Sequence, residues 1–432
     1  MASAQSVTTV RDGLLVGLDH ALDRAGLTRS TAGAWYGCSS AAGGLRIVAI
    51  GLVPNLTAEA ARRASLGAGG RVVGVYAGGL TRSDLVGIAG LGPDLIVLAG
   101  GTDGGDRRTI CWNAACLAEL ALSCPVVVAG NRAAADEVAD TLTEAGAEYC
   151  VVGNVMPRVD HLEPEACSAA IRRVFIERII RAKGFEAAQA FIGRGLVPTP
   201  NAVLAAFALL AQGTRAVPGL AELIGIDVGG ATTDVYSAAA GRPTTPRTTQ
   251  RGLAEPYLKR TVEGDLGVRI NAPAVVAAGR AELPGSQDVV PPAYADRVAR
   301  AVAALPACEE ERRLDVRLAA IAALIAARRH AGHLEVGYGI EGSYHVQYGK
   351  DLTAVPAVIG TGGVLSGCAR DPAECARILG PVGYDDGAPD LLLPRAPRRF
   401  VDRQYVLYAA GLLAADHPDA AAALARASLT EV

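Results

Sequence analysis

The sequence predicts an α/β protein built from two domains. Strand-like apolar runs alternate with helical patterns through the first half of the chain, the order that builds a parallel sheet covered by helices. Two strand-like stretches in the second half, within 223–239 and 355–365, each lead into a glycine-rich turn. The length of 432 residues is too great for one compact core and sufficient for two.

The predicted elements of the first half follow one another in regular alternation. Strands are predicted at 46–53, 71–76, 94–101, 125–131 and 149–152, and helices at 11–26, 57–66, 81–91, 107–122 and 132–145. The run DLIVLAGG at 94–101 is apolar as far as its glycines, as expected for a strand buried on both faces of a parallel sheet. A mainly helical segment, 164–211, and a linker, 213–219, complete this half.

The second half opens with two β-type runs at 223–239 that are joined by a glycine turn. Helices are predicted at 253–265 and at 295–330, the second broken near Pro306. The strand-like run 355–365 enters the second glycine turn. The segment DRQYVLYAAGLLAA at 402–415 is predicted to form a closing helix.

The composition excludes several classes of function. The net charge is −3 and the arginines are scattered, so the chain lacks the basic face of a nucleic-acid-binding protein. The nine cysteines include no C-x-x-C pair, which argues against zinc and against an iron–sulfur cluster. Their odd number, without an export signal, indicates reduced thiols in the cytoplasm. The most apolar helical stretch, Leu318–Ala327, is too short to span a membrane.

The turn that follows Asp227 is the most informative motif. Asp227 ends a strand, and Gly229 and Gly230 let the backbone turn without Cβ clashes. The backbone amides and the hydroxyls of Thr232 and Thr233, before Asp234, can then face a polyphosphate. A carboxylate at the strand end suits a Mg²⁺ ion that keeps most of its waters. The alternative is a plain β-hairpin with a glycine turn.

Two other glycine turns are candidates for ligand contacts. Gly360, Gly362 and Gly363 follow an apolar run and could let the backbone approach an adenosine. Gly101, Thr102 and Asp103 lie in the loop 100–105, between a buried strand and a helix, where a phosphate could meet a helix N-terminus. Both could equally be structural turns. The chain contains neither a G-x-G-x-x-G fingerprint nor a Walker P-loop.

Charged residues at 259–265 form a fourth candidate. Glu263 could orient an attacking water and Asp265 could help Asp227 to hold a metal ion, the positioning roles that phosphoryl transfer requires. Asp227 and Glu263 are therefore the catalytic candidates, and Asp227 and Asp265 the metal ligands. The alternative is a solvated charged face of a helix.

Taken together, these motifs give the chain a family resemblance. It resembles the MutL/GlmL accessory proteins of glutamate mutase and related B12-dependent aminomutases. The resemblance spans nearly the whole chain. It rests on these segments: CSSAAGGL (38–45), VAIGLVPNLTAEAARRASLGAG (48–69), LAGGTDGG (98–105), VVVAGNRAAADEV (126–138), VPTPNAVL (197–204), DVGGATTDV (227–235), KRTVEGDLGVR (259–269) and GTGGVL (360–365).

The resemblance implies an actin/Hsp70-like (ribonuclease H-like) ATPase fold, with two lobes around a nucleotide cleft. The lobes would be 1–213 and 220–395, and a C-terminal helix at 396–432 would return to the first lobe. DVGGATTD would be the second phosphate loop and GTGG the adenosine loop. ATP or ADP and Mg²⁺ would be the cofactors. Cobalamin would enter only through the partner enzyme, and a homo-oligomer is possible.

The sequence departs from this family in one respect. Such proteins begin with a strand–turn of the type D-x-G-S/T-x-T-K, the first phosphate loop, and no D-x-G-[ST] occurs before Gly43. The chain starts at what resembles the following segment, TTVRDGLLVGLDHAL (8–22), so the first lobe would lack this hairpin. Two explanations compete: a start assigned too far downstream, or a natural variant that binds nucleotide poorly.

Three functions follow from these expectations. The first is an ATP-driven reactivase for an adenosylcobalamin-dependent mutase, an ATPase if the first phosphate loop is restored upstream. The second is a scaffold that binds mutase subunits without nucleotide, as the missing loop would favour. The third is a small-molecule kinase or a hydantoinase-like enzyme, because one fold can host many chemistries.

Overall fold

The structure is a computed structural model that describes residues 4, 6, 14–30, 33–39, 45–120, 123–182, 190–193, 196–283, 289–339, 342–383 and 388–432. The chain divides into two compact units, Met1–Leu52 with Ala60–Asn201 and Val53–Glu59 with Ala202–Val432. Residues 40–44 of the first family motif and residues 8–13 of the N-terminal segment lie outside the described residues. The segment 396–432 belongs to the second unit.

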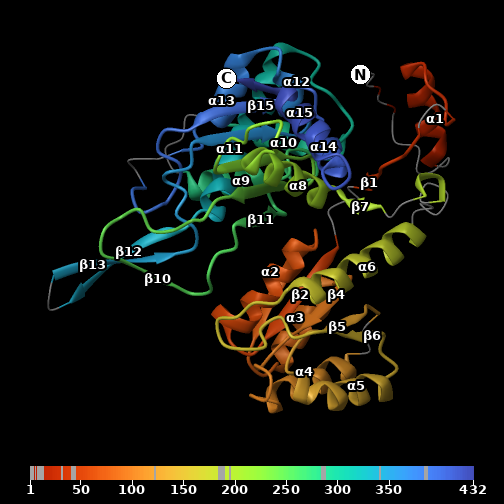
Figure 1. The fold of residues 1–432 in the computed structure, drawn as a ribbon, viewed down its shortest axis with the longest axis vertical. Coiled ribbons are helices and arrows are strands. Elements are labelled where there is room, and N and C mark those ends of the chain that lie inside the picture. The colour runs from red at the N-terminus through yellow and green to blue at the C-terminus, as the bar shows by residue number, and fades with distance from the viewer. Residues whose placement is uncertain are drawn as a thin grey trace. The chain divides into compact units, whose positions relative to one another are not determined.

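The first unit contains a five-stranded parallel sheet in the order β3-β2-β4-β5-β6 (Figure 1). The strands are β2 (Arg46–Gly51), β3 (Arg71–Ala77), β4 (Leu95–Leu98), β5 (Val126–Val128) and β6 (Tyr149–Val151). All four residues of β4 are buried, because a central strand of such a sheet is covered on both faces. The five strands predicted for this half are confirmed.

Helices cover both faces of this sheet. They are α2 (Glu59–Gly67), α3 (Arg82–Leu91), α4 (Arg108–Glu119), α5 (Ala135–Glu144) and α6 (Glu165–Ala182). Side chains of α3, α4 and α5 share one apolar core with Val48 and Ile50 of β2. The hydroxyl of Ser168 on α6 donates to the carbonyl of Ala64 on α2 at 2.9 Å, a bond that links these two helices. Outside this body, the unit holds α1 (Leu14–Ala25) and the short parallel pair β1 (Cys38–Ser39) and β7 (Val197–Pro198).

The second unit is built on a six-stranded mixed sheet in the order β11-β9-β8-β14-β15-β16. The strands are β8 (Leu223–Val228), β9 (Thr233–Ala238), β11 (Leu258–Glu263), β14 (Ala357–Thr361), β15 (Arg398–Asp402) and β16 (Leu429–Glu431). Strands β8, β9 and β11 form an antiparallel meander, whereas β14 and β15 run parallel to β8. The carboxyl ends of β8, β14 and β15 therefore meet at one edge of the sheet.

Helices pack on the two faces of this second sheet as well. They are α8 (Thr199–Gln212), α9 (Ala272–Glu282), α10 (Pro292–Arg300), α11 (Glu309–His330), α12 (Gly363–Cys368), α13 (Pro372–Leu379), α14 (Leu407–Leu413) and α15 (Pro418–Ser428). Helix α11 shares a core with Ile224, Ile226 and Val228 of β8. On the other face, the ring of Phe207 packs on Tyr236, and a Cβ at Gly225 would lie 2.2 Å from that ring.

Two sequence predictions for this unit are wrong. Residues 253–265 are not a helix, because 258–263 form β11 and pair antiparallel with β9. The residues 402–415 are not one helix either, since β15 extends to Asp402 and α14 begins at Leu407. By contrast, the break near Pro306 between two helices is confirmed by α10 and α11.

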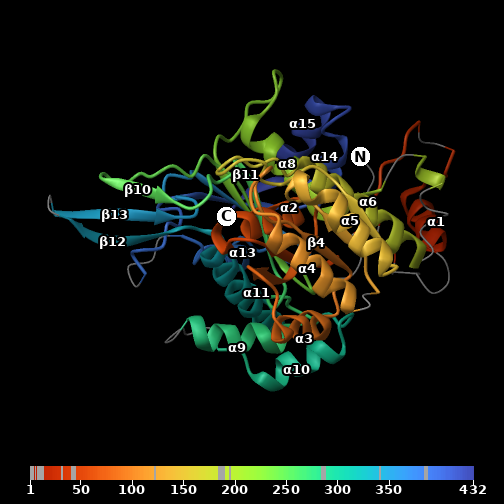
Figure 2. The same cartoon turned by 90° about the horizontal axis from the view of Figure 1, so that it is seen from below.

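A three-stranded sheet extends from the second unit as an arm (Figures 1 and 2). Its order is β10-β13-β12, with bounds Thr248–Arg251 (β10), Gly342–Tyr348 (β13) and His333–Gly339 (β12). Strands β12 and β13 form an antiparallel hairpin, and β10 runs parallel to β13. None of these three strands was predicted from the sequence. Within the described part of the chain, no helix is long and apolar enough to cross a membrane.

Candidate functional site

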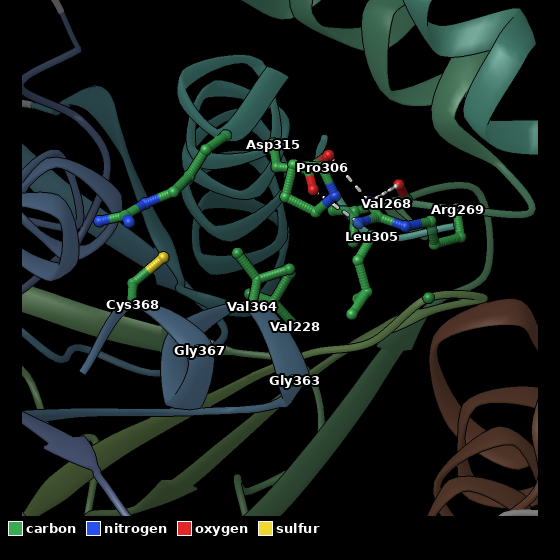
Figure 3. A pocket seen from close by; sticks show the side chains of 12 residues that line it. Val228, Val268, Arg269, Leu305, Pro306, Asp315, Gly363, Val364, Gly367 and Cys368 are labelled. Atoms are coloured by element: carbon green, nitrogen blue, oxygen red, sulfur yellow. Dashed lines mark hydrogen bonds and ion pairs between the residues drawn. The ribbon is translucent and has the colours of Figure 1, made fainter. Parts of the chain in front are cut away.

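A cavity of about 490 Å³ lies within the second unit (Figure 3). Four neighbouring segments wall it: the β8–β9 turn, the residues just before α9, the segment leading into α11 with that helix's first half, and α12. The lining residues are Val228, Gly230, Val268, Arg269, Leu305, Pro306, Arg312, Asp315, Gly363, Val364, Gly367 and Cys368. The cavity therefore brings together the glycine turns after Asp227 and after Thr361, which are far apart in the sequence.

The β8–β9 turn is tightly held. The amide of Gly229 donates to the carbonyl of Thr232 at 2.9 Å, and a Cβ at Gly229 would lie 2.7 Å from that oxygen. The amides of Val268 and Arg269 donate to the carbonyls of Gly229 and Gly230. The turn is a hairpin bend, as one alternative held, and it also faces a cavity. The hydroxyl of Thr233 is buried and donates to the carbonyl of Leu266 at 2.6 Å. It therefore does not face the cavity, although the sequence analysis expected it to face a ligand.

The second glycine turn packs directly against the end of β8. Gly362 has φ +106°, a conformation that favours glycine. A Cβ at this position would lie 2.4 Å from the carbonyl oxygen of Val228 and 2.9 Å from Oδ1 of Asp227. Gly363 lines the cavity, whereas Gly360 lies buried inside β14, where it packs below Leu365 and Leu379.

Three carboxylates gather at the edge where these strands end. Burial, and after it the negative charges of Asp234 and Asp402, raise the pKa of Asp227 to about 7, while the charge of Arg260 opposes them. Asp234 is paired with Arg260, whose Nη2 lies 2.5 Å from its Oδ1. Asp402 accepts from the Thr361 hydroxyl at 3.0 Å. A group of like charges with one arginine as counter-ion attracts a cation.

Asp402 is the residue that the sequence reading missed. It follows the apolar residues Phe400 and Val401 at the carboxyl end of β15, as Asp227 stands near the end of β8. The same signal, a carboxylate closing a buried strand, could have identified it. The helix predicted at 402–415 conceals this signal, because it places Asp402 at a helix start and not at a strand end.

Glu263 and Asp265 are not brought to Asp227. Glu263 pairs with Thr233 in the β11–β9 register, whereas Asp234 pairs with Val262 and with Asp227. Because successive strand residues point to opposite faces, Glu263 faces away from Asp227.

Arg329 of α11 instead binds both predicted acidic residues. Its Nη1 lies 2.9 Å from Glu263 Oε2 and 2.9 Å from Asp265 Oδ1, and its Nη2 lies 2.5 Å from Glu282 Oε1. The alternative, a solvated charged face of a helix, needs a helix that the chain does not form, because Glu263 ends the strand β11. The structure therefore makes these residues members of an ion-pair cluster with Arg329.

The wall formed by α11 carries two further ion pairs. Arg269 binds Asp315 through both nitrogens, at 3.0 and 2.6 Å, and Tyr294 donates to the same carboxylate at 2.8 Å. Arg312 is held at 2.8 Å by Glu374. These pairs fix the two guanidinium groups at the cavity, while the apolar side chains of Leu305, Pro306 and Val364 contribute a non-polar surface.

The loop 100–105 belongs to the first unit, whereas the cavity lies wholly within the second. Asn131 accepts from the amide of Gly104 at 3.0 Å. Asn154 donates to the carbonyl of Gly101 at 3.1 Å and to Asp103 at 2.9 Å. Asp103 and the backbone of Gly101 thus hold the loop in shape.

The residues at the cavity fit a nucleotide with a magnesium ion. A Cβ at Gly229 or Gly362 would meet a backbone oxygen, whereas one at Gly363 would meet no atom within 4 Å. Asp227 does not line the cavity, but its Oδ1 would lie 2.9 Å from a Cβ at Gly362 in the second turn. Among the described residues, no group of three His, Cys, Asp or Glu side chains could hold a metal ion alone. A Mg²⁺ ion that keeps its waters and shares phosphate oxygens needs only one or two carboxylates.

Comparison with known proteins identifies the family. The model of the family described as MutL protein matches residues 1–429. Protein MutL of Clostridium tetanomorphum is 42% identical over 442 residues, an alignment that covers 100% of this chain and 94% of the relative. A nucleotide-free structure of acetone carboxylase, from a study of ATP-dependent acetone carboxylation, is 13% identical. It covers 96% of this chain and 67% of its own, with a TM-score of 0.33. The resemblance drawn from the motifs is confirmed, and the chain belongs to the MutL family.

Proposed function

We propose that this protein is a cytoplasmic, ATP-dependent accessory protein that reactivates an adenosylcobalamin-dependent mutase of the glutamate mutase type. The proposal rests on one observation: Gly230 and Gly363, one from each glycine turn, line the same cavity, and Asp227 lies against the second turn at Gly362. Membership of the MutL family supports association with mutase subunits.

The strand order of the second unit supports an actin-like fold. Taken in chain order, β8, β9 and β11 form an antiparallel meander, and β14 and β15 add to the free side of β8 in parallel. This is the arrangement expected of a ribonuclease H-like lobe. In such a lobe, the phosphate turn lies between the first two strands, as the turn 229–232 does here.

Each part of the cavity would have its own task. The turn amides at Gly230 and the hydroxyl of Thr232 would bind phosphate oxygens, and Asp227 would accept hydrogen bonds from waters of a magnesium ion. Gly363 would let adenosine approach α12, and Leu305 and Pro306 would cover an apolar ring. The bound nucleotide would supply the free energy that favours one arrangement of the protein over another.

Equilibrium dialysis with ATP and magnesium tests the proposal. The protein is expected to bind ATP, and Asp227→Asn is expected to bind it at least about ten-fold more weakly, because a charge-assisted contact is lost. Asp296→Asn, which changes an exposed carboxylate on α10, is the matched control. Binding that is absent, or unaffected by Asp227→Asn, contradicts the proposal.

A pull-down of mutase subunits separates the alternatives. Capture that depends on ATP and on Asp227 supports the reactivase. Capture that is indifferent to both selects the nucleotide-independent scaffold. Transfer of phosphate to a metabolite without capture selects the small-molecule kinase.

A further inference from the structure

A second cavity, of about 890 Å³, lies in the arm between the segment 242–249, which we call the strap, and the residues Gly339, Gly342, Ser343 and Tyr344 of the hairpin. The lining residues are Arg242, Pro243, Thr245, Arg247, Thr248, Thr249, Gly339, Gly342, Ser343 and Tyr344. We call this cavity the arm groove. Its volume lies within the roughly 300–1,000 Å³ of sites that enclose ligands of many atoms.

The arm groove is positively charged. Arg242 and Arg247 are both exposed, and no described residue forms an ion pair or side-chain hydrogen bond with either of them. None of the described lining residues is acidic. Elsewhere in the second unit, arginines at structural positions have carboxylate partners, as Arg260 has Asp234 and Arg398 has Glu431.

The backbone holds Arg247 in place at this groove. Its φ is +54°, a left-handed conformation that is uncommon outside glycine and costs about 1 kcal/mol or more. The amide of His345 donates to the Arg247 carbonyl at 3.0 Å, and the hydroxyl of Thr248 donates to the carbonyl of Thr245 at 2.7 Å. The first bond ties the strap to β13 and the second holds the strap's own turn, so together they hold the backbone from which the guanidinium extends.

The groove also borders an open strand edge. Strand β10 pairs with β13 on one side and is the terminal strand of the described three-stranded sheet. Its outer backbone groups are therefore available to an extended chain, the mode called β-augmentation. Thr248 and Thr249 belong both to this strand and to the groove lining.

We propose that the arm groove binds an acidic, extended peptide segment of a partner protein. Carboxylates of the segment would pair with Arg242 and Arg247, because guanidinium groups bind carboxylates in a planar, two-pronged geometry. The hydroxyls and glycines along the groove would accommodate its backbone. This inference goes beyond the proposed function and does not depend on nucleotide binding.

Fluorescence anisotropy with a fluorescein-labelled glutamate octapeptide tests the proposal. The full chain is expected to bind this peptide, to bind the glutamine octapeptide far more weakly, and to lose affinity as salt rises. The double variant R242Q/R247Q is expected to bind the glutamate octapeptide about ten-fold or more weakly than the parent, because two charge-assisted contacts disappear.

The matched control is R280Q/R300Q, which removes the same charge from exposed positions on α9 and α10. It is expected to bind the glutamate peptide within about two-fold of the parent, because charges beyond a Debye length are screened. Circular dichroism is the check that both variants fold like the parent.

Three outcomes overturn the proposal. The parent does not bind the glutamate peptide, or the control loses as much affinity as the groove variant. In the third, inorganic phosphate displaces the peptide at a lower concentration than free glutamate peptide does, which assigns the groove to a phosphate ligand.

Discussion

Arg260 and Asp234 form an ion pair that is almost fully enclosed, with Nη2 2.5 Å from Oδ1 and side chains 4% and 10% exposed. Asp234 on β9 is the cross-strand partner of Asp227 on β8, so the positive charge of Arg260 opposes both negative charges. The pair connects the stability of the sheet to the charge of the candidate site.

Replacing Arg260 with alanine should therefore destabilise the protein strongly. The loss of one partner leaves a buried carboxylate uncompensated, which costs about 3–5 kcal/mol in the free energy of unfolding. Urea denaturation measures the change. R260M/D234L, which removes both charges, should recover a large part of it. A loss below about 1 kcal/mol in Arg260→Ala would show that the pair is solvated.

The raised pKa of Asp227 predicts a pH dependence of stability. Its folded-state pKa is about 7 and its ordinary value is 3.8, so the folded protein keeps a proton that the unfolded chain releases. The stability that this proton confers is complete below about pH 4 and is lost as pH rises to about 7.

Asp227→Asn removes this dependence. Relative to the variant, the parent should lose about 1–3 kcal/mol in free energy of unfolding between about pH 5 and pH 8. This loss is smaller than the full pKa shift would give, because Asp227 is only half-buried and solvent screens its charge. Urea midpoints at the two pH values give the difference. Parallel changes in parent and variant would mean that Asp227 titrates normally.

The same titration should appear in nucleotide binding. If Asp227 binds the hydrated magnesium ion as a carboxylate, the affinity for magnesium–ATP should rise by up to about ten-fold per pH unit below 7 and level off above it. Equilibrium dialysis across this range measures it. A flat profile in the parent, or the same rise in Asp227→Asn, would remove Asp227 from the metal site.

Substitution at Gly362 should damage both packing and binding. Its φ of +106° and the 2.4 Å approach of a Cβ to Val228 oxygen mean that alanine forces the turn away from β8. We expect a loss of about 2–4 kcal/mol in stability and of most ATP affinity. The control is Gly90→Ala on the helix α3, outside the cavity, which meets no atom within 4 Å and should be neutral or slightly stabilising. Equal effects of the two changes would contradict the tight contact.

The position of Glu263 predicts that it is not catalytic. Glu263→Gln should leave the rate of any ATP hydrolysis within about two-fold of the parent's rate. It should reduce the free energy of unfolding by only about 1 kcal/mol, because its partner Arg329 also binds Asp265 and Glu282. A steady-state ATPase assay beside thermal unfolding measures both. A loss of activity of about a hundred-fold would return Glu263 to the water-orienting role.

Features encoded in short stretches were predictable from the sequence. The strand Leu95–Leu98 follows from an uninterrupted apolar run, and the turns at Gly229 and Gly362 follow from glycines placed directly after strands. In each case, the local residues alone restrict the backbone: apolar side chains require burial, and glycine allows a conformation that other residues avoid.

The tertiary structure decided what depends on residues distant in the sequence. Pairing with β9 makes 258–263 a strand rather than a helix, and the resulting alternation turns Glu263 away from Asp227 and towards Arg329. Asp402 joins Asp227 only because β14 and β15 are parallel to β8. A sequence specifies which segments can form strands, but the register between strands sets which side chains meet, and that register is fixed by packing across the whole sheet.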